Sequence, residues 1–90
     1  MKTEELFSKI QQKGYKAELV SAFAYRINKD KNYKSIHIFG VPNIELVDLV
    51  NEHNCYLVAA VLNRRIENDK WIQEVIYEVL PHNLDNLEFV

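Results

Sequence analysis

The first forty residues of this 90-residue chain and the forty that follow share one pattern of residue types. Apolar positions and a chain-breaking position recur forty residues later, and a charged segment recurs thirty-nine residues later. The matching positions are Thr3, Leu6, Phe7, Ile10 and Gly14 with Asn43, Leu46, Val47, Val50 and Asn54, and residues 26–31 with residues 65–70. Helical spacing precedes strand-like alternation in each half, so the repeat predicts two helix–hairpin units.

The first half is predicted to form one helix and two strands. Residues 3–13 carry a single apolar stripe, with Thr3 as the expected N-cap and Gly14 at the left-handed position that ends the helix. From residue 16 to residue 27 the apolar period changes to two, which is typical of a strand. After a polar turn, residues 33–39 are expected to return as the second strand of a hairpin.

The second half repeats this order. Asn43 is the expected cap of a helix over residues 43–53. Residues 56–66 are apolar on both faces, which favours a central strand. Residues 70–80 fit a strand by alternation and a helix by their i, i+3, i+4, i+7 spacing. The richness in β-branched and aromatic residues and the position in the repeat favour a strand, and Pro81 ends it.

These elements predict an α+β fold in the order αββαββ, with a four-stranded antiparallel sheet and two helices packed on one face. The chain is expected to be a single domain over residues 1–90, with pseudo-repeat halves 1–40 and 41–81. The tail, residues 82–90, is too apolar to stay in solvent, so it is expected to dock on the protein or on a partner.

Composition narrows the class of protein. Hydrophobic residues make up 48% of the chain, which is ample for a core, and the net charge is −2. Cys55 is the single cysteine, so no internal disulfide can form and a reducing compartment is favoured. No apolar run reaches the ~20 residues of a membrane span, and the first residues do not resemble a signal peptide. We therefore expect a cytoplasmic protein without a membrane partner.

No pattern of catalytic, cofactor-binding or metal-ligating residues is found. His53 and Cys55 fall at a predicted helix-to-strand junction, where residues two apart do not face each other, and a buried Cys55 is the favoured interpretation. The three histidines, completed by His37 and His82, lack the short spacing of metal ligands. The chain is therefore expected to be non-enzymatic, with no cofactor and no metal ion. A small enzyme using His37 or His53 is the least supported alternative.

The charge pattern favours a protein-binding module. Glu45, Asp48 and Glu52 lie on one predicted helix face at i, i+3 and i+7, where they can steer a basic partner. Trp71 and Tyr77 are the expected aromatic anchors. A small acidic domain of this kind can occlude a site on a macromolecular target, as an inhibitor, an antitoxin or a phage-type anti-defence or accessory protein does.

The main alternative is an RNA- or DNA-binding protein that uses basic hairpin tips. Cations gather near the two predicted turns, where a pseudo-symmetric fold can present both tips on one side. They are Arg26, Lys29, Lys31, Lys34, Arg64, Arg65 and Lys70. Acidic residues in the same turns dilute this patch. A homodimer that pairs edge strands is compatible with either function.

Overall fold

The computed structural model describes residues 2–23 and 31–90, except the side chains of residues 23, 61 and 63. The predicted α+β fold is confirmed, and the segment that fitted either a strand or a helix is a strand. The elements are α1 (Thr3–Gln12), β1 (Lys16–Phe23), β2 (Asn32–Phe39), α2 (Ile44–Glu52), β3 (Cys55–Glu67), β4 (Lys70–Pro81) and a short 3-10 helix, η2 (Leu84–Asn86). The end of the strand predicted over residues 16–27 lies outside the described residues.

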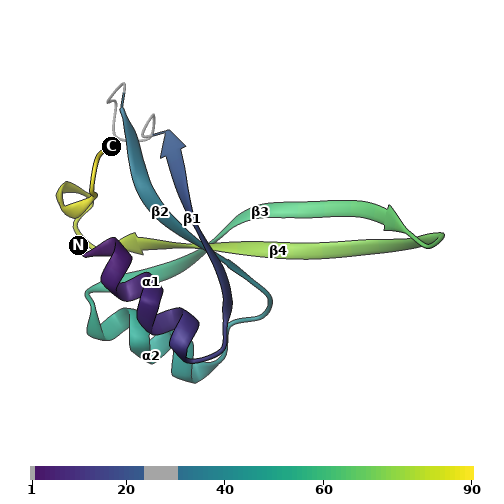
Figure 1. Ribbon diagram of the computed structural model, residues 1–90, viewed down its shortest axis with the longest axis horizontal. Helices are drawn as coiled ribbons and strands as arrows, with labels where there is room; N and C mark the ends of the chain where they lie inside the picture. Colours follow the sequence, from purple (N-terminus) through teal and green to yellow (C-terminus); the bar gives the residue numbers. More distant parts are fainter. Residues whose placement is uncertain (1, 24–30) are drawn as a thin grey trace.

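The four strands form one antiparallel sheet in the order β1-β2-β4-β3. This order is symmetric about the β2–β4 contact, so each half supplies one helix, one central strand and one outer strand (Figure 1). The expectation that the 56–66 strand is central is wrong, because β3 is an outer strand. Its second apolar face is explained by a cluster on the far side of the sheet that includes Tyr56 and Val58.

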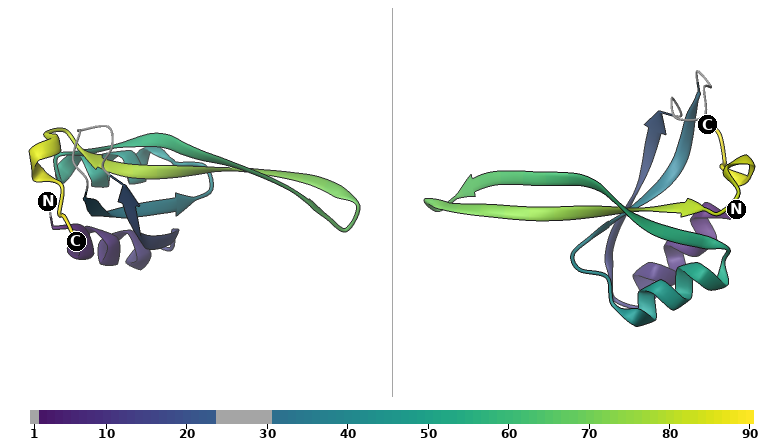
Figure 2. Two further views of the ribbon diagram at one scale, coloured as in Figure 1. Left: turned by 90° about the horizontal axis from the view of Figure 1, so that it is seen from above. Right: turned by 180° about the vertical axis from the view of Figure 1, so that it is seen from behind.

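Both helices lie on the same face of the sheet, as predicted (Figures 1 and 2). Their apolar stripes meet the inward residues of the strands in one core. Its members are Leu6, Ile10, Ala17, Ile36, Ile38, Leu46, Leu49, Val50, Cys55 and Val79. Burying a Leu, Ile or Val side chain contributes about 1.5–3 kcal/mol, so this cluster is the main source of stability.

Four residues are expected at the helix ends from the repeat, and three of them have the expected role. Asn43 caps α2 by accepting a hydrogen bond from the Leu46 amide at 2.9 Å. Gly14 and Asn54 follow the two helices with φ of 91° and 58°, the left-handed conformation expected there. Thr3 is not the N-cap of α1, because it is already helical and Lys2 precedes it without a side-chain cap.

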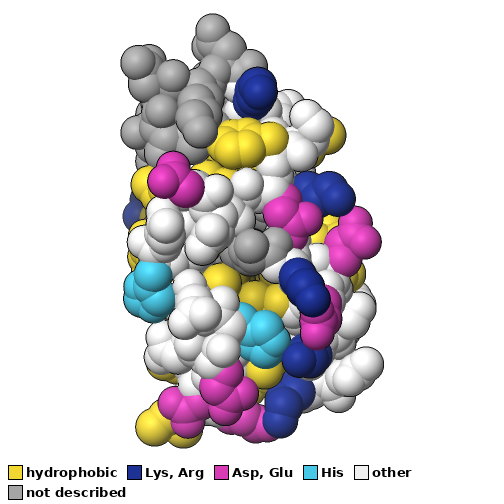
Figure 3. Space-filling model, turned by 90° about the vertical axis from the view of Figure 1, so that its left-hand side faces the viewer, with side chains coloured by type: hydrophobic (Ala, Val, Ile, Leu, Met, Phe, Trp, Pro, Cys, Tyr) yellow, Lys and Arg dark blue, Asp and Glu magenta, His cyan; other side chains and the backbone are white. Residues whose placement is uncertain are grey.

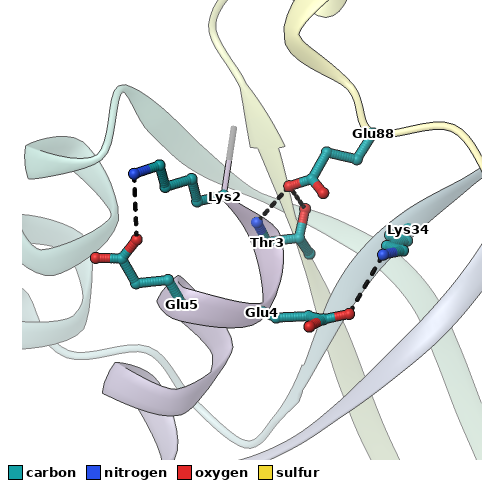
Figure 4. Close-up of a pocket in the computed structure, with 6 residues that line it drawn as sticks. All are labelled: Lys2, Thr3, Glu4, Glu5, Lys34 and Glu88. Atoms are coloured by element: carbon teal, nitrogen blue, oxygen red, sulfur yellow. Dashed lines mark hydrogen bonds and ion pairs between the residues drawn. The ribbon is translucent and has the colours of Figure 1, made fainter.

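The missing cap of α1 comes from the C-terminal tail. The Thr3 backbone N–H and hydroxyl both donate to one carboxylate oxygen of Glu88, 85 residues away in the sequence (Figure 4). These residues line a polar pocket of about 310 Å³ with Lys2, Glu5 and a Lys34–Glu4 ion pair. The Thr3 N–H lowers the pKa of Glu88 below its ordinary value.

The tail also covers the sheet face opposite the helices. The Lys34 amide donates to the Glu88 carbonyl at 2.7 Å, and Tyr33 forms an antiparallel bridge with Phe89. Leu87 is buried in a second cluster with Tyr33 and Leu80. The tail therefore docks on the protein itself, which was one of the two expected outcomes.

The second hairpin is longer than the described part of the first. β3 and β4 span 13 and 12 residues, whereas β1 and β2 span 8 each. The excess projects beyond the helices as a two-stranded ribbon along the longest dimension of the molecule, whose extents are 44 × 31 × 17 Å (Figures 1 and 2).

The Glu88 contact predicts a pH dependence of stability. Because the folded pKa is lowered, the contact stabilises fully above the unfolded pKa and its contribution is lost as pH falls through the folded pKa. Glu88→Gln is expected to cost about 0.5 kcal/mol near neutral pH by removing a charge at a helix N-terminus. Urea unfolding between about pH 6 and pH 3 should then be less pH-dependent than in the wild type. Glu5→Gln is the control, and equal slopes for Glu88→Gln and the wild type would contradict the assignment.

Candidate functional site

The projecting ribbon, residues 62–75, is a two-stranded arm. β4 pairs with β2 only as far as the Phe39–Ile76 pair, and from Val75 outward it pairs with β3 alone. The tip is a two-residue turn in which Asn68 and Asp69 have φ of 51° and 60°. Positive φ at both positions is the type I′ geometry that matches strand twist, so the arm is a regular hairpin.

A β-bulge decides which side chains share a face of the arm. The β3–β4 register shifts between Ala59 and Val61. Before the bulge, Leu57 lies opposite Val79 on the helix-packed face; after it, Leu62 lies opposite Val75 on the continuation of that face. Strict alternation along residues 56–66 predicts Leu57 and Leu62 on opposite faces, which is wrong because the extra residue of the bulge resets the period.

The face that continues from the core is apolar and exposed on the arm, and we call it the arm face. It carries the directly opposed pairs Leu62–Val75, Arg64–Gln73 and Ile66–Trp71. Leu62, Ile66 and Trp71 are 47%, 62% and 76% exposed. In the rest of the sheet, α1 and α2 cover the apolar side chains of this face. On the arm, no described element covers them.

The opposite face of the arm is polar apart from Ile72, which lies opposite Arg65, and Arg65 pairs there with Glu67 and Glu74. Arg65 donates two hydrogen bonds to the two Glu74 oxygens, both at 3.2 Å, and a third to Glu67 at 3.1 Å. The Glu74 carboxylate raises the pKa of Arg65, and Arg65 lowers the pKa of Glu74. This bidentate ion pair joins β3 to β4 across the ribbon and helps to hold its shape.

The residues predicted to bind a protein partner do not form one surface. Glu45, Asp48 and Glu52 are all exposed on α2, and Glu45 also pairs with Lys13 at 3.0 Å. Trp71 lies near the tip of the arm, away from α2. Tyr77 is partly buried against the core at the root of the arm. Of the two predicted anchors, therefore, Trp71 has a free surface and Tyr77 has a structural role.

The basic residues predicted to bind nucleic acid are also dispersed. Arg26 and Lys29 lie outside the described residues. The other predicted cations on the first hairpin, Lys31 and Lys34, are near the start of β2, and Lys34 pairs with Glu4. Those of the second hairpin, Arg64, Arg65 and Lys70, are on the arm, which projects in another direction (Figure 1).

Acidic residues accompany these cations on both parts of the molecule. Glu67, Asp69 and Glu74 balance the three cations of the arm. At the end of the molecule opposite the arm, Lys or Arg side chains lie beside Asp or Glu side chains (Figure 3). Neither region presents a continuous surface of one sign.

The titratable groups named as catalytic alternatives have structural partners. His37 Nε2 lies 3.4 Å from Glu78, whose other oxygen accepts a hydrogen bond from Tyr33 at 2.9 Å. His53 at the end of α2 contacts the Leu49 carbonyl at 3.0 Å. Cys55 is buried, as predicted, and burial raises the pKa of its thiol. Within residues 2–23 and 31–90, no group of three His, Cys, Asp or Glu residues could hold a metal ion.

Comparison with protein-family models, with curated proteins and with solved structures finds no match to this chain. Among the described residues, no helix is both long enough and apolar enough to cross a membrane.

Sequence reasoning identified Trp71 but missed the arm face. Two signals were present: residues 56–66 and 70–80 form longer strand patterns than residues 33–39, and their connection leaves room for a tight two-residue turn. No feature of the sequence indicates the position of the bulge, because Ala59 and Ala60 are compatible with either face of the sheet. Without the bulge position, Ile66 and Leu62 could not be assigned to the core side.

The arm should be a separately opening unit. Arg65→Met removes the three hydrogen bonds to Glu67 and Glu74 and is expected to speed amide exchange severalfold in residues 62–67 and 70–75. The global unfolding free energy should stay unchanged, because the arm lies outside the core. Exchange measured by NMR on Arg65→Met and on the control Arg64→Met tests this. Accelerated exchange throughout β1 and β2 would contradict it.

Proposed function

We propose that this chain is a small non-enzymatic protein-binding module, and that the arm face is its main contact surface. On binding, the side chains of Leu62, Ile66 and Trp71 become buried against a macromolecular target. The module then acts by occlusion, as an inhibitor, an antitoxin or an anti-defence or accessory protein does. We also propose a cytoplasmic location, which the single free cysteine supports.

The observation that carries this proposal is the exposure of large apolar side chains along one side of a thin ribbon. An isolated two-stranded hairpin is marginally stable in water, so its apolar residues do not hold it together by burial. Exposed apolar patches of a few hundred Å² often mark interaction sites. Residue 71 is also a tryptophan, one of the residue types most enriched among interface hot spots.

The turn and the ion pairs preorganise this surface. The type I′ turn at Asn68 and Asp69 and the Arg65–Glu74 pair fix the ribbon without using any residue of the arm face. Less conformational freedom is then lost on binding, which favours affinity. The exposed Asp48 and Glu52 on α2 add a negative field that can accelerate association with a basic target.

Nucleic-acid binding through the arm is the alternative that the same geometry can accommodate. A two-stranded ribbon fits the major groove of DNA, and Arg64 and Lys70 have no ion-pair partner within the described residues. The support is weaker because the arm carries three acidic residues with its three cations and because Arg65 is already paired. In a nucleic-acid complex, the carboxylates of Glu67, Asp69 and Glu74 would have to be accommodated near the phosphates.

The test compares capture of partners by two matched variants. Ile66→Ser/Trp71→Ser removes the apolar character of the arm face, and Leu84→Ser/Val90→Ser removes two exposed apolar side chains of the tail. Tagged proteins are incubated with lysate from the native source, with and without nuclease. We expect a stoichiometric protein partner with the wild type and the tail variant, and about tenfold less with the arm variant.

Two results would contradict the proposal. Equal recovery of the partner by both variants would mean that the arm face is not the contact. Recovery only when nucleic acid is intact, with binding to oligonucleotides that falls steeply as salt increases and weakens in Arg64→Ala, would support the nucleic-acid alternative instead.

A further inference from the structure

We propose that the arm face binds a second copy of this chain, so that two chains form a symmetric dimer by exchanging arms. Each arm would lie on a second exposed apolar surface at the start of α2 of the other chain. This inference rests on the proposed function, since it takes the arm face as a protein contact, and it adds the identity of one partner.

The second surface is formed by Val41 in the loop before α2 and by two residues of the helix. Val41, Ile44 and Val47 are 89%, 79% and 39% exposed. Ile44 and Val47 lie at i and i+3, so they are neighbours on one side of α2, while Leu46 and Val50 face the core. We call these three residues the helix patch. Among the described residues, Val41 and Ile44 are not part of either apolar cluster of the chain.

The two surfaces have the size that a stable dimer needs. At the observed exposures, the three apolar residues of the arm face present on the order of 400 Å², and the helix patch presents a similar area. In an arm-exchanged dimer each chain contributes both surfaces, on the order of 800 Å² in all. Complete burial of both surfaces would reach the ~800 Å² per partner of a standard protein–protein interface.

The charges beside the two surfaces are opposite. Arg64 lies on the arm face between Leu62 and Ile66, and no described residue forms an ion pair with it. Asp48 is exposed one turn after Ile44, on the same side of α2, and it too is unpaired within the described part of the chain. A contact of the arm face with the helix patch can therefore place Arg64 beside Asp48 of the other chain.

The placement of the two surfaces suits a two-fold axis. The loop between β2 and α2 lies on the side of the body from which the arm projects, in the front and rear views alike (Figures 1 and 2). A second chain rotated by a half-turn can then lay its arm on this helix patch while it receives the first arm on its own. Such an interface is isologous and closed, so it ends at two chains.

The test is sedimentation equilibrium of the full chain over a range of concentrations, with variants in both surfaces. We expect the wild type to be a dimer at tens of micromolar, and Trp71→Ser and Ile44→Ser each to raise the dissociation constant at least about tenfold. Arg64→Asp and Asp48→Arg should each weaken the dimer, and the double variant should recover affinity because the pair is restored in reverse. Lys31→Glu is the control for an unrelated change of charge. Circular dichroism verifies that each variant is folded.

Each possible outcome decides the matter. A wild type that stays monomeric at high concentration would overturn the dimer, and so would a dimer that survives both Trp71→Ser and Ile44→Ser. If the wild type is monomeric but the lysate partner is lost in the arm variant, the proposed function holds and the partner is a different protein. If neither assay depends on the arm face, both proposals fail.

Discussion

Four residue pairs between β2 and β4 hold the two halves of this protein in one sheet. Ile36 and Val79, which face each other in this contact, are fully buried, and Ile38 beside them is 1% exposed. Both helices close over these side chains, so the core exists only because the two hairpins meet here. The order β1-β2-β4-β3 is the arrangement that lets two equivalent units share one apolar face. The repeat in the sequence thus corresponds to a physical junction between units that could not bury their helices alone.

The arm exists because the contact between β2 and β4 is short. β2 ends at Phe39 and turns to α2, whereas β4 and β3 continue outward as a pair. Beyond that point no third strand or helix of the described residues accompanies the ribbon, yet the bulge near Ala60 brings Leu62 and Ile66 of β3 to the core side, where Trp71 of β4 also lies. We interpret this as a binding surface because the energetic reason for large apolar residues on the body, burial against helices, is absent on the arm.

Much of the fold could be predicted from local patterns. The Asn43 cap, the left-handed Gly14 and Asn54 and the strand over residues 70–80 depend on nearby residues and on the repeat, and all three are confirmed. The failures depend on distant partners. Thr3 is the first residue of α1 and not its cap, and Glu88 from the other end of the chain accepts the hydrogen bond of its N–H. The outer place of β3 follows from the pairing order of the strands, which periodicity does not encode. For the candidate site, sequence identified the residue type at Trp71 but neither its exposure nor its separation from Tyr77 and the acidic helix.

Site-specific photo-cross-linking tests the central claim, that the arm face is a protein contact, most directly. A benzophenone amino acid is placed at position 71 in one sample and at position 90 in another, since Trp71 and Val90 are almost equally exposed, at 76% and 77%. We expect irradiation in lysate to give a discrete protein adduct from position 71 and none from position 90. No protein adduct from position 71, or the same adduct from both positions, would contradict the assignment of the arm face as the binding surface.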